Sequence, residues 1–261
     1  MLALFATGVC SLLAIFIAQQ AIECESKIVR AVKIAMTISQ SGRSNDVGWN
    51  NAKSEMLQLI NEGVVINPHY RKLTPIVADA LAGWGDWKNA TWIWESVLES
   101  RPFVVALLAN ASRGEMQAGD FSKAEEYIRR AKILQPNLPA LATLEVMLWS
   151  RTGKEHEAGL RARELLRDKA IDPDLIRTAY YLGMRNRDSE LAIRALELQI
   201  NTWPNQAVDG WLKLGQIYDA PQAKNQSKAM QSYQAAFKAA DPRYKEPVLA
   251  MIPQIYHAKI K

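Results

Sequence analysis

A small residue returns every 34 positions through the middle of this 261-residue chain, at Ala90, Ala124, Ala158 and Ala192. Five positions before the first three alanines the chain has a glycine, and Arg187 takes that place before the fourth. Twelve positions after them it has a proline in three of the four cases. These glycines and prolines are Gly85, Gly119, Gly153, Pro102, Pro136 and Pro204. Such agreement in phase indicates an internal repeat, and a period of this length is typical of stacked helical hairpins.

The spacing inside each unit predicts two antiparallel helices joined by a tight turn. Glycine at the turn can adopt the left-handed conformation that ends the first helix, and proline stops the second. The repeated alanine lets the second helix approach the first closely, and a large residue one turn later fills the space between units. Each unit leaves an apolar face uncovered, so the core forms only when neighbouring units stack.

The last unit has the clearest first helix, "WLKLGQIY", whose Trp211, Leu214, Gly215 and Tyr218 follow the spacing W-x-x-L-G-x-x-Y. Together with the small residues and prolines, this spacing resembles the tetratricopeptide repeat (TPR) over about two thirds of the chain. The resemblance implies an all-α fold, a TPR-like helix-turn-helix solenoid of about five repeats plus capping helices behind an N-terminal transmembrane helix. The expected units are 71–104, 105–138, 139–172, 173–206 and 208–243.

Composition agrees with a folded protein, because 49% of the residues are hydrophobic and 23% are charged. The net charge of +5 is mild, and the basic residues are interspersed with acidic ones. This pattern does not indicate a nucleic-acid partner.

Four of the eight tryptophans lie within "LAGWGDWKNATWIW", residues 81–94, which raises the question of a ligand platform. The repeat accounts for Trp94, one turn after Ala90, and for Trp87, because both occupy packing positions. Trp84 and Trp92 occupy places where the repeat requires no aromatic residue. Two interpretations remain for this second pair, packing against the preceding helix or an exposed contact surface.

The N-terminal stretch "MLALFATGVCSLLAIFIA" contains no charge. As a helix it would be about 27 Å long, close to the roughly 30 Å of a bilayer core. We therefore expect a transmembrane helix over residues 1–20. A cleaved signal peptide and a buried helix remain as alternatives, although no Lys or Arg precedes Lys27 as a signal peptide would require. The apolar run starts without a polar flank, as expected for the tail of a longer membrane protein.

Residues 21–68 are expected to form an amphipathic continuation and a capping helix pair. The spacing of apolar residues over 23–40 predicts a helix that continues the membrane helix. A second helix over about 47–61 would pair with it and stop near Gly63 and Pro68. The final residues, 244–261, are expected to form one helix that caps the end of the stack.

Residue types that carry catalysis or bind metals are few and scattered. His69, His156 and His257 have no partner at ligand spacing. Cys10 and Cys24 give neither a disulfide framework nor a metal-site pattern. The sequence has no P-loop, G-x-S-x-G, H-E-x-x-H or dinucleotide-binding glycine motif. We therefore expect no catalytic residue, no metal site and no cofactor in this chain.

Repeat proteins of this kind usually bind on the concave face, which the TPR resemblance assigns to the first helix of each unit. Its second, fifth, ninth, twelfth and thirteenth positions would line that face. The residues concerned are Lys72, Asp79, Arg113, Met116, Arg151, Arg177, Tyr181, Arg185 and Gln216. Four arginines on one surface would favour an acidic protein or peptide, or an anionic glycan. The alternative is that they are ordinary solvated helix residues.

The order of elements, with "HYRKLTPIVADALAGWGDWKNATWIWESVLESRP" and "LQINTWPNQAVDGWLKLG", is similar to the C-terminal region of bacterial O-antigen ligase/polymerase-type membrane proteins. Members of that family transfer lipid-linked glycans, and their catalytic loop lies between transmembrane helices that this chain does not contain. The resemblance implies a non-catalytic protein-interaction domain of the bacterial inner membrane. The alternative is a free-standing, single-pass TPR scaffold for an envelope complex.

The side of the membrane stays open. Lys27, Arg30 and Lys33 follow the apolar run. By the positive-inside rule they would place the repeats in the cytoplasm, but the last helix of a polytopic protein need not follow this rule.

The repeat register makes a prediction about packing. Ala124→Trp is expected to overfill the contact between the two helices of its unit and to lower the free energy of unfolding by at least about 1–3 kcal/mol. Glu126→Trp, on the expected outer face of the same helix, should be nearly neutral. Thermal unfolding followed by circular dichroism measures both, and equal losses would show that the register is wrong.

Overall fold

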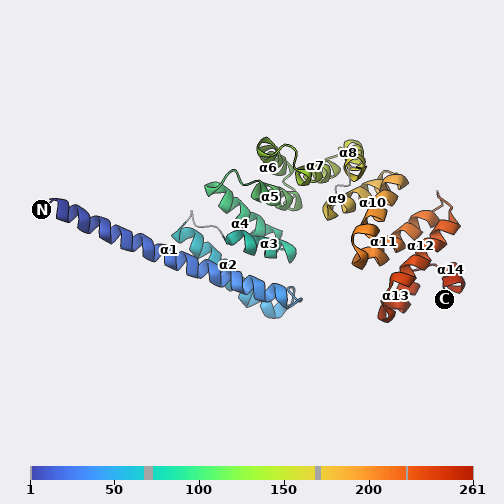
Figure 1. Cartoon of the computed structure of the whole chain (residues 1–261), viewed down its shortest axis with the longest axis horizontal. Helices are drawn as coiled ribbons and strands as arrows, with labels where there is room; N and C mark the ends of the chain where they lie inside the picture. The colour runs from blue at the N-terminus through green and yellow to red at the C-terminus, as the bar shows by residue number, and fades with distance from the viewer. Residues whose placement is uncertain (1, 68–72, 168–171, 222, 261) are drawn as a thin grey trace. The chain divides into compact units, whose positions relative to one another are not determined.

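The computed structural model describes residues 2–67, 73–167, 172–221 and 223–260, and side chains from residue 9 onward. Within these ranges every regular element is helical and no strand occurs. The chain forms two compact units, Met1–Asn137 and Leu138–Lys261, whose helices are labelled in Figure 1. Helices adjacent in sequence pack in antiparallel pairs within each unit, so the predicted all-α, helical-hairpin fold is confirmed.

In the first unit the elements are α1 (Leu2–Gln40), the short 3-10 helix η1 (Val47–Trp49), α2 (Asn50–Ile66), α3 (Thr74–Gly83), α4 (Trp87–Ser100), α5 (Val105–Ala118) and α6 (Phe121–Leu134). In the second they are α7 (Pro139–Arg151), α8 (Glu155–Arg167), α9 (Pro173–Arg185), α10 (Ser189–Thr202), η2 (Pro204–Gln206), α11 (Ala207–Asp219), α12 (Gln226–Ala239), η3 (Pro242–Tyr244), α13 (Lys245–Ala250) and α14 (Gln254–Ile260). Each predicted repeat therefore contains two helices.

The turns inside the hairpins have the predicted backbone conformation. Gly85, Gly119 and Gly153 have φ values of 88°, 85° and 80°, the left-handed region that glycine enters without a steric penalty. Arg187, in the fourth such place, also has a positive φ, 57°. At the first, second and fourth of these turns an aspartate follows and its side chain caps the next helix. Asp120, for example, accepts a hydrogen bond from the backbone N–H of Lys123, which satisfies a donor at the start of α6.

The repeated alanines are fully buried. Ala90, Ala124, Ala158 and Ala192 are each 0% exposed, because the two helices of a hairpin meet there. The large residue one turn later is also buried, as with Trp94 at 2% exposure. The contact distance between the helices therefore depends on the small side chain at this position.

The tryptophan cluster is mainly a packing feature. The Trp94 indole N–H donates a 3.1 Å hydrogen bond to Asp79 on α3, and the Trp87 and Trp94 rings lie 6.4 Å apart between centroids. Trp84 is half-buried and packs under the ammonium group of Lys53 on the preceding α2, 5.3 Å from its ring centroid. Trp92 is the exposed member of the cluster, at 38%.

The N-terminal apolar segment and its amphipathic continuation are one helix, α1, which is long and apolar enough to cross a membrane. Its second half packs against α2. Helix α2 is longer than the predicted 47–61 helix, because it continues through Gly63 to Ile66 and ends between the two predicted stop residues, Gly63 and Pro68. A Cβ at Gly63 would lie 3.0 Å from Cγ1 of Ile28 on α1. Gly63 therefore serves close helix packing and does not end the helix.

The C-terminal segment also differs from its prediction. Instead of one capping helix it forms η3, α13 and α14, and Pro253 separates the two α-helices. Proline cannot continue the hydrogen-bond pattern of a helix interior. Val248, Ile252 and Tyr256 still pack on α12 beside Tyr233, so the segment covers the end of the second unit.

Four polar residues join α4, α5 and α6 in the first unit. Lys123 Nζ lies 2.5 Å from Glu95 and 2.7 Å from Glu115, and the Tyr127 hydroxyl donates a 2.7 Å hydrogen bond to Glu95. Burial raises the pKa of Glu115. Burial also acts to raise the pKa of Glu95, but hydrogen bonds from Lys123 and Tyr127 lower it overall. Hydrogen bonds to Glu115 and Glu95 raise the pKa of Lys123, so its contribution to stability is fully present at neutral pH and is lost only as pH rises through that raised pKa.

Lys123→Met removes the only cation within ion-pairing distance of Glu95 and Glu115 among the described residues. We expect the free energy of unfolding at pH 8 to fall by about 1–3 kcal/mol, because two neighbouring carboxylates lose their charged donor. The loss should be smaller at pH 5, where the acidic pair can take up a proton. Denaturant titration at both pH values measures this effect.

Lys88→Met is the matched control, because Lys88 is an exposed lysine of α4 and changes at exposed sites usually stay within about 0.5 kcal/mol. Equal losses in the two variants, or a Lys123→Met loss that does not depend on pH, would contradict the role of the cluster.

Candidate binding groove

Helix α9 in the second unit has one face in the core and one face open to solvent. Leu175 and Ala179 on the core face are 0% exposed. Arg177, Tyr181 and Arg185 follow one another at intervals of four residues, which places them in one row along the helix surface. Tyr181 is 60% exposed, so this row is available for contact.

Three hollows of the surface lie along α9. The first, with a volume of about 260 Å³, is lined by Met147, Ser150, Arg151, Arg177, Thr178, Tyr181, Leu182 and Arg185. The second, also about 260 Å³, is lined by Pro173, Ile176, Arg177, Tyr180, Tyr181, Gln199, Trp203, Gln206, Asp209 and Lys213. The third, about 370 Å³, is lined by Tyr180, Gly183, Met184, Arg187, Ser189, Lys213, Gln216, Ile217, Ala220 and Ala223.

The three hollows are neighbours on the surface, because they share lining residues. Arg177 and Tyr181 line both the first and the second, and Tyr180 and Lys213 line both the second and the third. We name the surface formed by these residues the α9 groove. The first helices of three successive repeats, α7, α9 and α11, contribute to it, with additions from α10 and from the turns.

Aromatic and apolar groups form the middle of the groove. The Tyr180 and Tyr181 rings meet edge to face with centroids 5.2 Å apart, and Met184 is 48% exposed. The ammonium group of Lys213 lies 5.2 Å from the Tyr180 ring centroid, a cation–π contact that joins α9 to α11. Burial raises the pKa of Tyr180 above its usual value of 10.0, so its hydroxyl stays protonated at neutral pH and can donate a hydrogen bond.

Basic side chains outnumber acidic ones along the groove. Its lining includes Arg151, Arg177, Arg185, Arg187 and Lys213, against the single acidic residue Asp209.

Carboxylates near the groove pair with several of these cations. Asp174 pairs with Arg177 and Glu155 with Arg185, while Asp209 lies 2.7 Å from Lys213. The side chains of Arg177 and Arg185 remain 64% and 62% exposed. Exposed ion pairs contribute about 0–1 kcal/mol, so a bound carboxylate could replace these partners at small cost.

The structure brings together five of the nine residues that were expected on the binding face. Arg151, Arg177, Tyr181 and Arg185 line the first hollow, and Gln216 lines the third.

The other four residues belong to the first unit. Asp79 accepts hydrogen bonds from Trp94 and Asn110, and Asn110 in turn accepts one from Arg113. Burial raises the pKa of Asp79. Met116 is only 2% exposed, so it belongs to the core and not to a contact surface. Lys72 lies outside the described residues.

Sequence reasoning missed several residues of the groove, among them Tyr180, Met184, Trp203 and Lys213. Tyr180 and Lys213 lie between the assumed binding positions of the first helix, and Trp203 follows the second helix of its unit. Met184 occupies the twelfth position of its unit but was not included in the expected set. A signal was present, because Tyr180 and Tyr181 are adjacent on a helix whose core face is already filled by aliphatic residues. Lys213 lies on α11, the first helix of the last repeat, and the turn that follows α11 is longer than the turns inside the other repeats.

Within the described part of the chain no group of His, Cys, Asp and Glu side chains could hold a metal ion. The α9 groove presents aromatic rings, cations and hydrogen-bond donors.

No protein-family model matches the sequence, and no curated protein matches it. Solved structures share its fold. The chain is similar to PilF of Pseudomonas aeruginosa, with a TM-score of 0.54 at 13% identity over 87% of this chain and 98% of that one. It is similar to a tetratricopeptide repeat protein of Parabacteroides merdae, with a TM-score of 0.55 at 13% identity over 87% and 91% of the two chains. MamA aligns with a TM-score of 0.50 at 15% identity over 68% of this chain and 94% of MamA.

At these identities the similarities define the fold alone. The fold is that of the tetratricopeptide repeat, in which helical hairpins stack on one another.

Proposed function

We propose that this chain is a membrane-anchored TPR interaction domain whose α9 groove binds an extended peptide segment that carries carboxylates. The observation that carries the proposal is the row of three neighbouring hollows, in which five basic side chains line the same surface as exposed aromatic and apolar groups. Arginine and a carboxylate form charge-assisted, often bidentate hydrogen bonds. Tyrosine and methionine supply apolar contact beside them.

The dimensions of the groove favour a short extended segment. Helix α9 has 13 residues and is about 20 Å long at 1.5 Å per residue. An extended chain covers about 3.3 Å per residue, so about six residues would follow the groove. Acidic side chains would reach the row of Arg177 and Arg185, and an apolar side chain would meet Tyr181. An anionic glycan offers similar charges but fewer apolar groups for Tyr181 and Met184.

The apolar part of α1 supports the membrane anchor. Leu12, Phe16 and Ile17 are 69%, 58% and 65% exposed, so the described part of the chain leaves most of their surface open. A helix with such a surface over most of a bilayer thickness is stable in lipid, because all its backbone groups are hydrogen-bonded internally. The bacterial inner membrane is the proposed location.

For the wider role we propose the C-terminal interaction region of an O-antigen ligase/polymerase-type glycan transferase, in which other parts of the protein carry the chemistry. The similarity of the sequence phrases around the repeats supports this proposal. The second candidate is a single-pass scaffold for an envelope complex, which the same fold and anchor would serve. The genomic frame upstream of Met1 separates the two, because only the first requires further apolar spans encoded in frame.

Charge reversal in the groove tests the peptide proposal. Arg151→Glu with Arg177→Glu is expected to raise the Kd for a fluorescent peptide of alternating Glu and Leu at least tenfold, about 1.4 kcal/mol. The reason is that attraction in the first hollow becomes repulsion. Fluorescence anisotropy measures the binding, which should also weaken as salt rises because the groove is open to water.

The matched control is Arg161→Glu with Arg194→Glu, which changes the net charge equally at half-exposed positions on α8 and α10. Arg163 is unsuitable because it pairs with Asp188, the residue that caps α10. A peptide with Gln in place of Glu should bind the parent protein weakly. Equal weakening by both double variants, or tight binding of the Gln peptide, would contradict the proposal, and stronger binding of a carboxylated oligosaccharide would favour the glycan.

A further inference from the structure

The α1–α2 pair has a boundary between charged and uncharged surface at one level on both helices. On α1 the first charged residue is Glu23, preceded by the apolar segment. On α2 the last charged residue is Glu62, followed by Gly63, Val64, Val65 and Ile66. The two helices are antiparallel, so the uncharged end of α2 points in the same direction as the apolar segment of α1.

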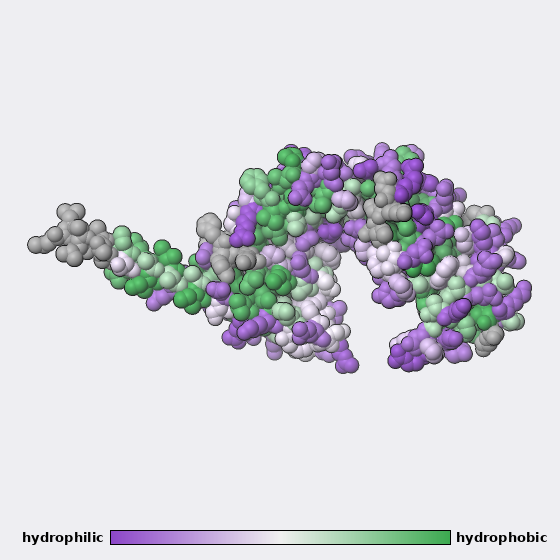
Figure 2. All heavy atoms as spheres, viewed as in Figure 1, coloured by the Kyte–Doolittle hydropathy of each residue, from purple (hydrophilic) through white to green (hydrophobic). Residues whose placement is uncertain are grey.

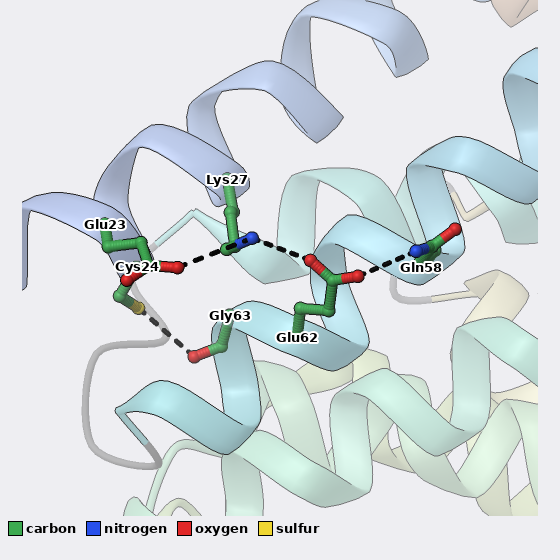
Figure 3. A network of polar contacts seen from close by, with 6 residues as sticks. All are labelled: Glu23, Cys24, Lys27, Gln58, Glu62 and Gly63. Atoms are coloured by element: carbon green, nitrogen blue, oxygen red, sulfur yellow. Dashed lines mark hydrogen bonds and ion pairs between the residues drawn. The ribbon is translucent and has the colours of Figure 1, made fainter. Parts of the chain in front are cut away.

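Contacts between the helices set this register (Figure 3). Lys27 on α1 donates a 2.7 Å hydrogen bond to Glu62 on α2, and the Cys24 thiol donates to the Gly63 carbonyl at 3.2 Å. Glu62 is further held by Gln58, one turn earlier on α2. Because α2 runs on for three residues after Gly63, its last turn reaches about 4.5 Å further, beside the residues that precede Cys24 on α1.

The last turn of α2 is exposed and apolar. Val65 is 76% exposed and Ile22 on α1 is 68% exposed, while Val64 and Ile66 are half-buried. Further exposed apolar side chains, among them Phe16 and Ile17, precede Ile22 on α1. Figure 2 shows hydrophobic residues in green along the projecting helix. In both helices the uncharged stretch borders a glutamate, Glu23 on α1 and Glu62 on α2.

We propose that the last turn of α2, Val64–Ile66, contacts the bilayer at the boundary between headgroups and acyl chains, together with Ile22 of α1. This inference rests on the proposed membrane anchor. Its partner is a lipid surface, chosen because the patch is continuous with the segment that would cross the membrane and ends where charge begins. Apolar side chains at this depth leave water, while Glu23, Lys27 and Glu62 stay among the headgroups.

One consequence is a fixed orientation of the α1–α2 hairpin. Helix α1 has no break between its apolar segment and the half that packs on α2, and residues Ile28, Ala31 and Ile38 of that half are 0% exposed. The hairpin therefore stands upright on the membrane as an extension of the spanning helix. Its far end, near Val47, would lie about 25 Å from the bilayer surface, given some 17 residues of α2 at 1.5 Å each.

Environment-sensitive labels test the inference in vesicles of phosphatidylcholine and phosphatidylglycerol. Three single substitutions, Leu12→Cys, Val65→Cys and Val47→Cys, each introduce a labelling site at an exposed apolar residue. Val47 is 77% exposed. The parent protein for these variants carries Cys10→Ser and keeps the buried Cys24. The parent is first tested with the label to show that Cys24 does not react. Each protein carries the fluorophore NBD, and lipids with a doxyl quencher near the headgroup or deep in the acyl chain are added.

We expect the label at 12 to lose emission with the deep quencher, the label at 65 with the headgroup-proximal quencher, and the label at 47 with neither. The valines at 65 and 47 are matched in residue type and exposure. Quenching at 12 without quenching at 65 would overturn this inference and leave the anchor intact. No quenching at 12 would overturn the anchor and with it this inference. Quenching at both 65 and 47 would show a hairpin lying flat on the membrane, which also overturns it.

Discussion

The close approach of two helices at a buried alanine is the contact on which the rest of each unit depends. Ala90, Ala124, Ala158 and Ala192 are each fully buried, and none of them carries a side-chain atom beyond Cβ. Interiors are packed at near-crystalline density, so the helix distance cannot adjust freely to a larger residue. The left-handed turns at Gly85, Gly119 and Gly153 serve the same geometry, because they return the chain onto the helix that it has just left.

This packing also determines which surface of α9 remains exposed. Leu175 and Ala179 on the core face of α9 are fully buried. The opposite face is left to Arg177, Tyr181 and Arg185, which no neighbouring helix covers. The α9 groove is thus formed by residues that the hairpin contacts do not use. Its charges are held near local carboxylates in exposed pairs, an arrangement that keeps the side chains soluble and leaves them able to exchange partners.

At the N-terminal end the same use of small residues joins the apolar helix to the first unit. Gly63 allows α2 to pack closely against Ile28, and the Cys24 thiol bonds to the carbonyl of that glycine. The proposed membrane segment and the half of α1 that packs on α2 belong to one continuous helix, so the α1–α2 pair has a defined direction relative to that segment. A flexible linker would leave the direction undetermined. The proposed lipid contact at the end of α2 follows from this rigidity.

The sequence alone determined the helical hairpins, their period and their turns, because these depend on local spacing: a glycine for a positive φ, an alanine at a close contact and a proline after a helix. The repeat pattern also predicted that Arg151, Arg177, Tyr181 and Arg185 lie on one face of the stack, and in the structure these four residues line one hollow. Only the tertiary structure decided that Met116 is buried, that Tyr180 and Lys213 belong to the groove, and that Gly63 lies inside a helix. An average repeat gives the direction of a side chain, but burial and partners depend on the particular neighbours that approach from other helices, and those contacts are non-local.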